Sequence, residues 1–245
     1  MTSRDPVPAP EITVIGTAGA AANNVALPAH QPGDLIIFCA RRANITAPTI
    51  LAASGTVPAW TQLQGGTGAN TLGLVVAAAT ATANNHTSGM WTNADQVAVI
   101  VLRGNYPLSV GGSSLISNAS AAIVTYPALT LTRTDGTSMG IRVAARAGTT
   151  GTNVAAPAGW TNRVEQPATT RLVNIFSRGA LTANILQEPA AQAPDAASRA
   201  VSLEVVIPPP TGAGPRGLPS ARATWPAGIC SRWQISAPAT WRCFL

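Results

Sequence analysis

Short hydrophobic runs separated by turn-forming residues make up most of the sequence, and they predict strands rather than helices. In 201–207 apolar residues alternate with Ser202 and Glu204, which is the period of a strand with one face in water. The runs 35–39 and 97–102 are apolar at every position, which is typical of central strands covered on both faces. The pattern therefore predicts an all-β protein, with candidate strands at 11–16, 34–40, 60–63, 71–79, 96–103, 128–133, 138–145, 160–165, 171–177 and 199–207.

An internal repeat organises these strands into two halves. Segments 33–63 and 136–164 each begin with a glycine, continue into an apolar strand and a connection rich in Thr, Ala and Pro, and contain a Trp-Thr pair after a proline. Two more candidate strands follow each Trp. We therefore expect two similar halves, about 10–104 and 120–207, that form either two sheets of one sandwich or two small sandwiches. Because each half offers few and short strands, one jelly-roll-like antiparallel β-sandwich over residues 1–207 is the favoured architecture.

The tryptophans inside this region receive different interpretations. Trp60 and Trp160 hold matching places in the repeat, just after a proline at a strand start, so we expect them to cap the sandwich core. Trp91 has no counterpart in the second half. It is therefore the candidate for a surface position that contacts a ligand.

The region 208–245 differs in composition from the rest of the chain. It begins with three prolines and a Gly/Pro-rich stretch that cannot support a hydrogen-bonded ladder, which predicts an extended linker. After the linker come three of the six tryptophans, several arginines and no acidic residue, a composition typical of interface hot spots. We expect an extended C-terminal arm that docks on a partner subunit, with a short hairpin folded back on its own domain as the alternative. The candidate partner contacts are Trp225, Arg232, Trp233, Trp241 and Arg242.

Composition and charge narrow the classes of function. All 15 cationic residues are Arg, so the formal net charge of +6 does not titrate near neutral pH. The arginines are scattered, which argues against a direct nucleic-acid interface. No apolar run is long enough for a spanning helix and no signal-peptide pattern is visible, so we expect no membrane insertion. The three cysteines are too few for a disulfide framework and suit a reducing cytoplasm, with a bond between Cys230 and Cys243 left open.

Candidate catalytic groups are sparse. His30 and His86 lie in turn-like surroundings without ligand-type neighbours, so we expect solvated loop side chains and no metal site. The nine carboxylates are dispersed, and no G-x-S-x-G, phosphate-loop or H-E-x-x-H motif occurs. The sequence therefore predicts neither enzyme activity nor a cofactor.

Four short motifs resemble those of a known family. They are the Pro-Gly-Asp-apolar stretch at 31–37, the Pro-Ala-Trp-Thr start at 58–61, the apolar strand that ends in Arg-Gly at 99–104, and the Pro-Ala-Gly-Trp-Thr start at 157–161. In this order they resemble the β-sandwich domains of tailed-bacteriophage virion surface proteins, over about 30–207 and with Ala59 where glycine is usual. The resemblance implies a non-enzymatic structural component of the virion surface, a head-decoration (cement) or minor tail protein. Such a protein is assembled in the host cytoplasm and anchored by contacts with capsid or tail subunits and with copies of itself.

Two other classes of function stay open at this point. A carbohydrate-binding adhesin module would recognise a glycan of the host cell surface through Trp91 and the loops 64–70 and 148–153. A β-sandwich hydrolase would need a pair of carboxylates that converge in one cleft.

Overall fold

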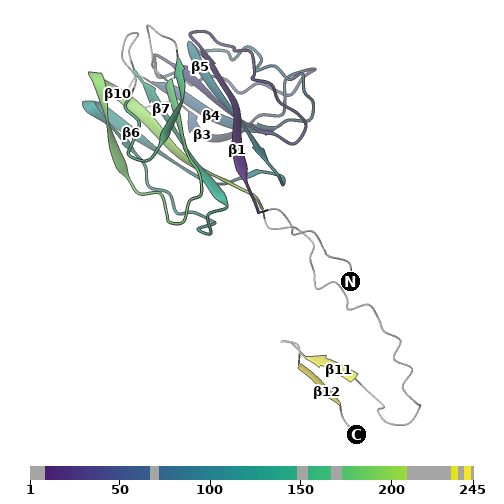
Figure 1. Ribbon diagram of the computed structural model, residues 1–245. Coiled ribbons are helices and arrows are strands. Elements are labelled where there is room, and N and C mark those ends of the chain that lie inside the picture. The colour runs from purple at the N-terminus through teal and green to yellow at the C-terminus, as the bar shows by residue number, and fades with distance from the viewer. Residues whose placement is uncertain are drawn as a thin grey trace. The chain divides into compact units, whose positions relative to one another are not determined.

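The computed structural model describes residues 9–66, 72–147, 154–166, 173–208, 233–236 and 240–243, and these ranges contain strands but no helix. Ten of the strands form two antiparallel five-stranded sheets, and two short ones form a separate hairpin (Figure 1). The all-β prediction is confirmed. Within the described ranges there is accordingly no helix long and apolar enough to cross a membrane.

Each sheet is built from five consecutive strands of the chain. The first sheet has the order β1-β5-β2-β4-β3, and its strands are β1 (Ile12–Ala20), β2 (Leu35–Arg42), β3 (Thr61–Gly66), β4 (Gly73–Thr80) and β5 (Gln96–Gly104). The second sheet has the order β6-β10-β7-β9-β8, and its strands are β6 (Ser109–Tyr126), β7 (Ser138–Arg146), β8 (Thr161–Gln166), β9 (Val173–Arg178) and β10 (Glu188–Val206).

The two sheets repeat the same strand order, with β6 to β10 in the places of β1 to β5. Local irregularities repeat too, because the ladder shifts register between Gln62 and Gln64 in β3 and between Asn162 and Val164 in β8. The halves of the sequence are thus the two sheets of one sandwich. This order differs from the favoured jelly roll, because a jelly roll shares the strands of each half between both sheets.

The glycine that opens each repeat makes a tight turn before the central strand. Gly33 and Gly136 adopt φ of 95° and 82°, a left-handed backbone that favours glycine. The N–H of Gly33 donates to the carbonyl of Ala81 at 2.8 Å, and the N–H of Gly136 donates to that of Leu181 at 3.0 Å. Each turn thus joins the start of β2 or β7 to the residues that follow β4 or β9.

The main hydrophobic core lies between the sheets. Ile37 and Cys39 of β2 contribute to it from one side, and Ile141 and Val143 of β7 from the other. Strand β1 packs against β8, and β3 packs against β6. Burial raises the pKa of the Cys39 thiol, which is a core residue as predicted.

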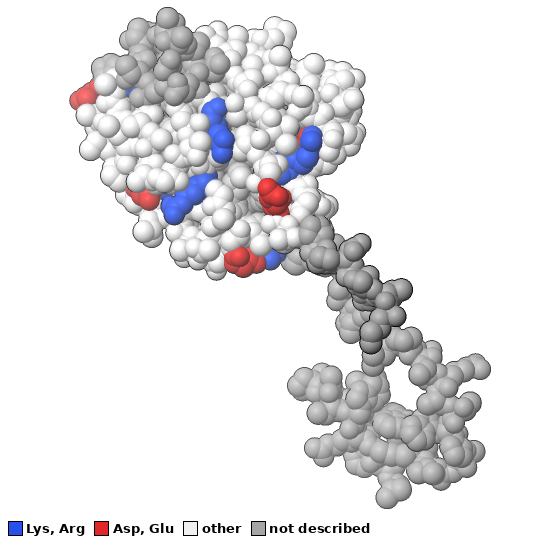
Figure 2. Space-filling model, in the orientation of Figure 1, with Lys and Arg blue, Asp and Glu red and all other residues white. Residues whose placement is uncertain are grey.

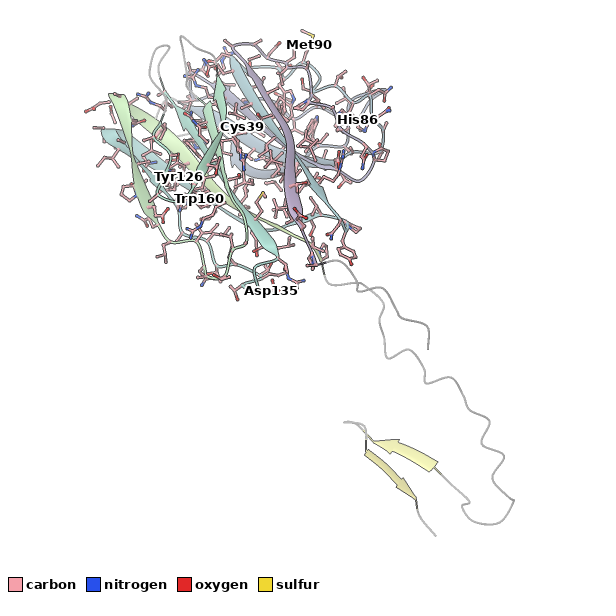
Figure 3. All side chains as sticks on the ribbon, in the orientation of Figure 1. Cys39, His86, Met90, Tyr126, Asp135 and Trp160 are labelled. Carbon is pink, nitrogen blue, oxygen red and sulfur yellow. The ribbon has the colours of Figure 1, made fainter. Side chains whose placement is uncertain are left out.

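Loops cover the outer face of each sheet and create two further clusters. Trp60 belongs to the cluster outside the first sheet and Trp160 to the one outside the second, which confirms both as core residues. Figure 3 shows Trp160 beside Tyr126, which belongs to the same cluster.

Because both faces of β2 and β5 are covered, residues 35–40 and 97–102 are apolar without alternation. In β10 the polar residues Ser202 and Glu204 are buried as well, so the prediction that 201–207 has one face in water is wrong.

Two stretches of the second half differ from the strand prediction. Segment 128–133 is not a strand and has only an isolated bridge between Leu129 and Ile185. Its backbone is held instead by the buried carboxylate of Glu204 on β10. The sequence did not predict β6, and β10 is longer than the predicted strand 199–207. The two strands pair with each other, and their Ser- and Ala-rich residues lack a clear hydrophobic period.

The chain divides into two compact units, Met1–Pro208 and Pro209–Leu245. The first unit contains the sandwich. In the second, the structure describes a hairpin of β11 (Trp233–Ser236) and β12 (Thr240–Cys243).

Candidate functional site

The predicted partner contacts all fall in the second unit. Trp225 and Arg232 lie outside the described residues, whereas Trp233 lies on β11, and Trp241 and Arg242 lie on β12. The structure therefore places three of the five on one hairpin.

The ladder register of this hairpin separates apolar from polar positions. Trp233 is paired with Cys243, and Ile235 with Trp241. Directly paired residues share a face of an antiparallel ladder, and faces alternate along each strand. Four apolar positions therefore share one face. The other face receives the positions of Gln234, Ser236, Thr240 and Arg242.

Trp91, the candidate ligand contact, is a core residue. It is 0% exposed, its ring stacks on Phe38 with centroids 4.9 Å apart, and its Nε1–H donates to the carbonyl of Ser88 at 2.9 Å. The prediction of a surface position is wrong because Trp91 fills the space beside Trp60 on the outer face of the first sheet. Trp91 has no counterpart in the second half because the outer clusters of the two sheets are packed with different side chains.

His30 and His86 are also buried, contrary to the expectation of solvated loop side chains. They are 8% and 9% exposed, and their rings stack with centroids 5.8 Å apart. Among the described residues, no group of three or more His, Cys, Asp or Glu side chains gathers as a metal site would require.

A buried arginine replaces an aromatic ring in the second half. In the first sheet Gln62 of β3 pairs with Ala77 of β4, which pairs in turn with Phe38 of β2. In the second sheet Asn162 of β8 pairs with Phe176 of β9, which pairs in turn with Arg142 of β7. Phe38 and Arg142 therefore hold equivalent places. The contacts of the two residues agree with this equivalence. Phe38 lies 5.4 Å from the ring centre of Trp60, and the guanidinium carbon of Arg142 lies 4.3 Å from that of Trp160.

The Arg142 guanidinium is held on several sides. It lies 5.0 Å from the Tyr126 ring, donates to the Glu188 carboxylate and donates to the carbonyl of Leu186 at 2.7 Å. Burial lowers the pKa of Arg142, and Glu188 opposes that shift. Sequence reasoning missed this residue because one arginine among apolar strand positions resembles a solvated side chain.

A second buried arginine links the two sheets. Arg41 of β2 donates through Nε to the carbonyl of Arg146 on β7 at 2.8 Å, and through Nη1 to Asp95 at 2.7 Å. Burial lowers the pKa of Arg41, while Asp95 raises it. Arg41 thus fastens one end of the sandwich.

The carboxylates of the sandwich are largely engaged in structural contacts. Asp34 is 1% exposed and accepts two hydrogen bonds from Arg103 at 2.7 Å and one from the backbone of Gln31 at 2.8 Å. Burial alone would raise the pKa of Asp34, but these hydrogen bonds outweigh it and hold the pKa below its ordinary value. Asp135 is exposed, and its hydrogen bonds from Arg133 and Thr137 likewise lower its pKa.

The surface charges do not gather by sign on the face seen in Figure 2. Over the described residues of that face, Arg side chains and carboxylates are scattered among uncharged residues. On this face the described residues form no basic stripe of the kind that a nucleic-acid groove presents.

Comparison with known proteins finds no family model, no curated protein and no solved structure that matches this chain.

Proposed function

We propose that the protein is a non-enzymatic structural component of a bacteriophage virion, a head-decoration or minor tail protein. In this proposal the sandwich is a rigid body on the particle, and residues 209–245 are an arm that anchors it to capsid or tail subunits and to other copies of the chain. The four motifs that resemble phage β-sandwich domains supply the class of function.

The observation that carries the proposal is the hairpin of the second unit. A two-stranded hairpin is at best marginally stable alone in water, and this one has only four residues in each strand. Its register nevertheless assigns the positions of Trp233, Ile235, Trp241 and Cys243 to one face of the ladder. A partner surface that buries this face would supply the missing stabilisation, since Trp is prominent among interface hot spots.

The sandwich supports a structural role from its side. Asp34, Asp95, Asp135 and Glu188 each pair with an arginine, and Glu204 binds backbone N–H groups. Carboxylates committed in this way are poorly placed for acid–base chemistry. Many weak contacts repeated over a symmetric particle add up to firm attachment without a large interface in each copy.

Incorporation into particles tests the anchoring role. The chain truncated after Pro208 should fold with the thermal stability of the full chain but be lost from purified particles. Trp233→Ala with Trp241→Ala should reduce incorporation, whereas Gln234→Ala, at a position of the opposite face, should not. Unchanged incorporation of both the truncated chain and the double variant would refute the anchoring role.

The adhesin alternative loses its main support. Trp91 is buried in the fold and cannot present its ring to a glycan. Most of the loops 64–70 and 148–153 lie outside the described residues, so they add no site geometry. A glycan array probed with the full chain tests this alternative directly.

A further inference from the structure

A small hollow lies on the outer side of the second sheet. It is lined by Trp160, Arg178, Glu188 and the segment 180–186, which follows β9, and its volume is about 190 Å³. Sites for drug-sized molecules usually measure about 300–1,000 Å³. This hollow therefore suits a smaller molecule or a single side chain of another protein.

The hollow exists because the two halves cover their outer faces differently. In the first half, Trp91 of the covering loop packs against Trp60, with ring centroids 5.9 Å apart. The segment 180–186 contains no aromatic residue and contributes only aliphatic side chains to the outer cluster. Space therefore stays open beside Trp160, the tryptophan that matches Trp60.

Backbone hydrogen bonds hold the covering segment in place at two points. The N–H of Leu181 donates to the carbonyl of Ser138 at 3.1 Å, and the carbonyl of Leu181 accepts the N–H of Gly136 at 3.0 Å. Ile185 and Leu129 exchange two such bonds, at 2.9 and 3.0 Å. Because this wall is fixed before a ligand arrives, binding costs less conformational entropy than it would in a mobile loop.

The charges at the hollow leave one guanidinium without a carboxylate. Glu188 forms an ion pair with Arg142. Arg178 is exposed and forms no ion pair with any side chain that the structure describes. Burial lowers the pKa of Arg142, and the nearby charge of Arg178 adds to that shift. Two neighbouring cations thus share one anion, and this imbalance favours a negatively charged ligand.

Further donors and an apolar side chain line the same hollow. Asn184 accepts the backbone N–H of Leu131 through Oδ1 at 3.0 Å, which leaves its N–H₂ group to donate elsewhere. Thr182 adds a hydroxyl, and Leu186 adds an aliphatic side chain that is 69% exposed. An ionised carboxylate accepts hydrogen bonds on both oxygens and donates none. It therefore suits these walls better than a cation does.

We propose that this hollow binds a carboxylate group carried on a short aliphatic stem. Arg178 is the ionic partner of the ligand, since the planar guanidinium matches a carboxylate in geometry as well as in charge. The ligand is either an acidic side chain presented by another protein or a free dicarboxylate, and both offer the same group. The site belongs to the first unit, so it goes beyond the proposed anchoring by residues 209–245 and is tested without particles.

Titration of the full chain at pH 7, followed by NMR, tests the site with glutarate as the probe. Glutarate should shift the amide signals of residues 178–188 in a saturable way. Glutaramide, which has the same carbon skeleton and no charge, should bind about tenfold or more weakly, as expected for the loss of a charge-assisted hydrogen bond. A blocked Ala-Glu-Ala peptide distinguishes the two sources, because tighter binding than that of glutarate supports a protein side chain and weaker binding supports a free dicarboxylate.

Two variants separate the site from general attraction to a cationic protein. Arg178→Gln should weaken glutarate binding about tenfold or more, whereas Arg42→Gln, with the same loss of charge on the first sheet, should not. Ala183→Leu adds volume to the wall and should also weaken binding, which keeps the test open if Arg178→Gln proves unstable. Absence of saturable shifts at 178–188, equal binding of glutaramide, or an unchanged affinity in folded Arg178→Gln would overturn the proposal.

Discussion

Glu204 offers the sharpest test of how the second half is held together. Its side chain is 0% exposed and replaces a β ladder as the attachment of segment 128–133. Oε2 accepts the backbone N–H of Thr132 at 2.7 Å and the hydroxyl of the same residue at 2.8 Å, and Oε1 accepts the backbone N–H of Arg133 at 3.0 Å. We predict that Glu204→Gln, which keeps the shape, destabilises the sandwich.

The magnitude follows from counting donors. A glutamine has one oxygen, so at best it keeps the contacts with Thr132 and turns its amide N–H₂ toward the N–H of Arg133. The variant loses at least one charge-assisted hydrogen bond, worth about 1.5–3 kcal/mol, and leaves donors facing each other in a buried site. We expect a loss of about 3 kcal/mol in the free energy of unfolding, which for a domain of this size lowers Tm by about 6–12 °C.

Chemical denaturation and thermal melting at pH 7 measure the effect. Glu11→Gln makes the same chemical change at an exposed side chain and should alter the free energy of unfolding by less than about 0.5 kcal/mol. Thr132→Val should cost less in the Glu204→Gln background than in the wild type, because the two residues share hydrogen bonds. A Glu204→Gln protein as stable as the wild type would show that this carboxylate does not anchor the segment.

Three further predictions concern the first sheet and its equivalence with the second. Trp91→Ala should lower the free energy of unfolding by about 4 kcal/mol, as for other buried aromatic residues, and Trp91→Phe by clearly less, both by denaturant titration. The pKa of Asp34 is lowered in the fold, so its ionised carboxylate adds stability at pH values above the ordinary pKa of 3.8, and this stability is lost as pH falls through the lower pKa of the folded state. Asp34→Asn should therefore be less stable than the wild type at pH 7, and melts at decreasing pH should show the difference shrinking once pH falls below 3.8. Phe38→Arg should destabilise by more than about 3 kcal/mol, because no carboxylate faces that position as Glu188 faces Arg142, and melting of the two single variants Phe38→Arg and Arg142→Phe should show the first to be the less stable.

Strand positions were predictable from the sequence where hydrophobic runs decide them. The repeat of a glycine, an apolar strand and a Trp-Thr start located β2, β3, β7 and β8 and placed Trp60 and Trp160 in the core. Residues 128–133 have the alternation of a strand but find no partner strand, because Glu204 takes the backbone N–H groups of Thr132 and Arg133 and the Asn184 side chain takes that of Leu131. A single carboxylate some seventy residues away gives no local signal.

The polar groups of the interior were beyond sequence reasoning for a different reason. His30 and His86 have the neighbours of loop residues, and their burial depends on three loops that meet only in the folded chain. The burial of Arg142 was equally hard to predict, because it depends on contacts of the guanidinium with Trp160, Tyr126 and Glu188, which are distant in the sequence. Charged side chains are rarely buried in general, and composition does not identify the few that are buried with hydrogen-bonding or ionic partners.

The two sheets share their strand order and their inner core, and they differ on their outer faces. Outside the first sheet, Phe38 and Trp91 are closed in by loops that the histidine pair fastens. Outside the second, Arg142 and Glu188 form an ion pair in the corresponding place. The same strand order thus supports two different outer clusters, since a change of side chains suffices and no change of strand order is needed. Trp60 and Trp160, which the sequence repeat matches, nevertheless hold equivalent places in these two outer clusters.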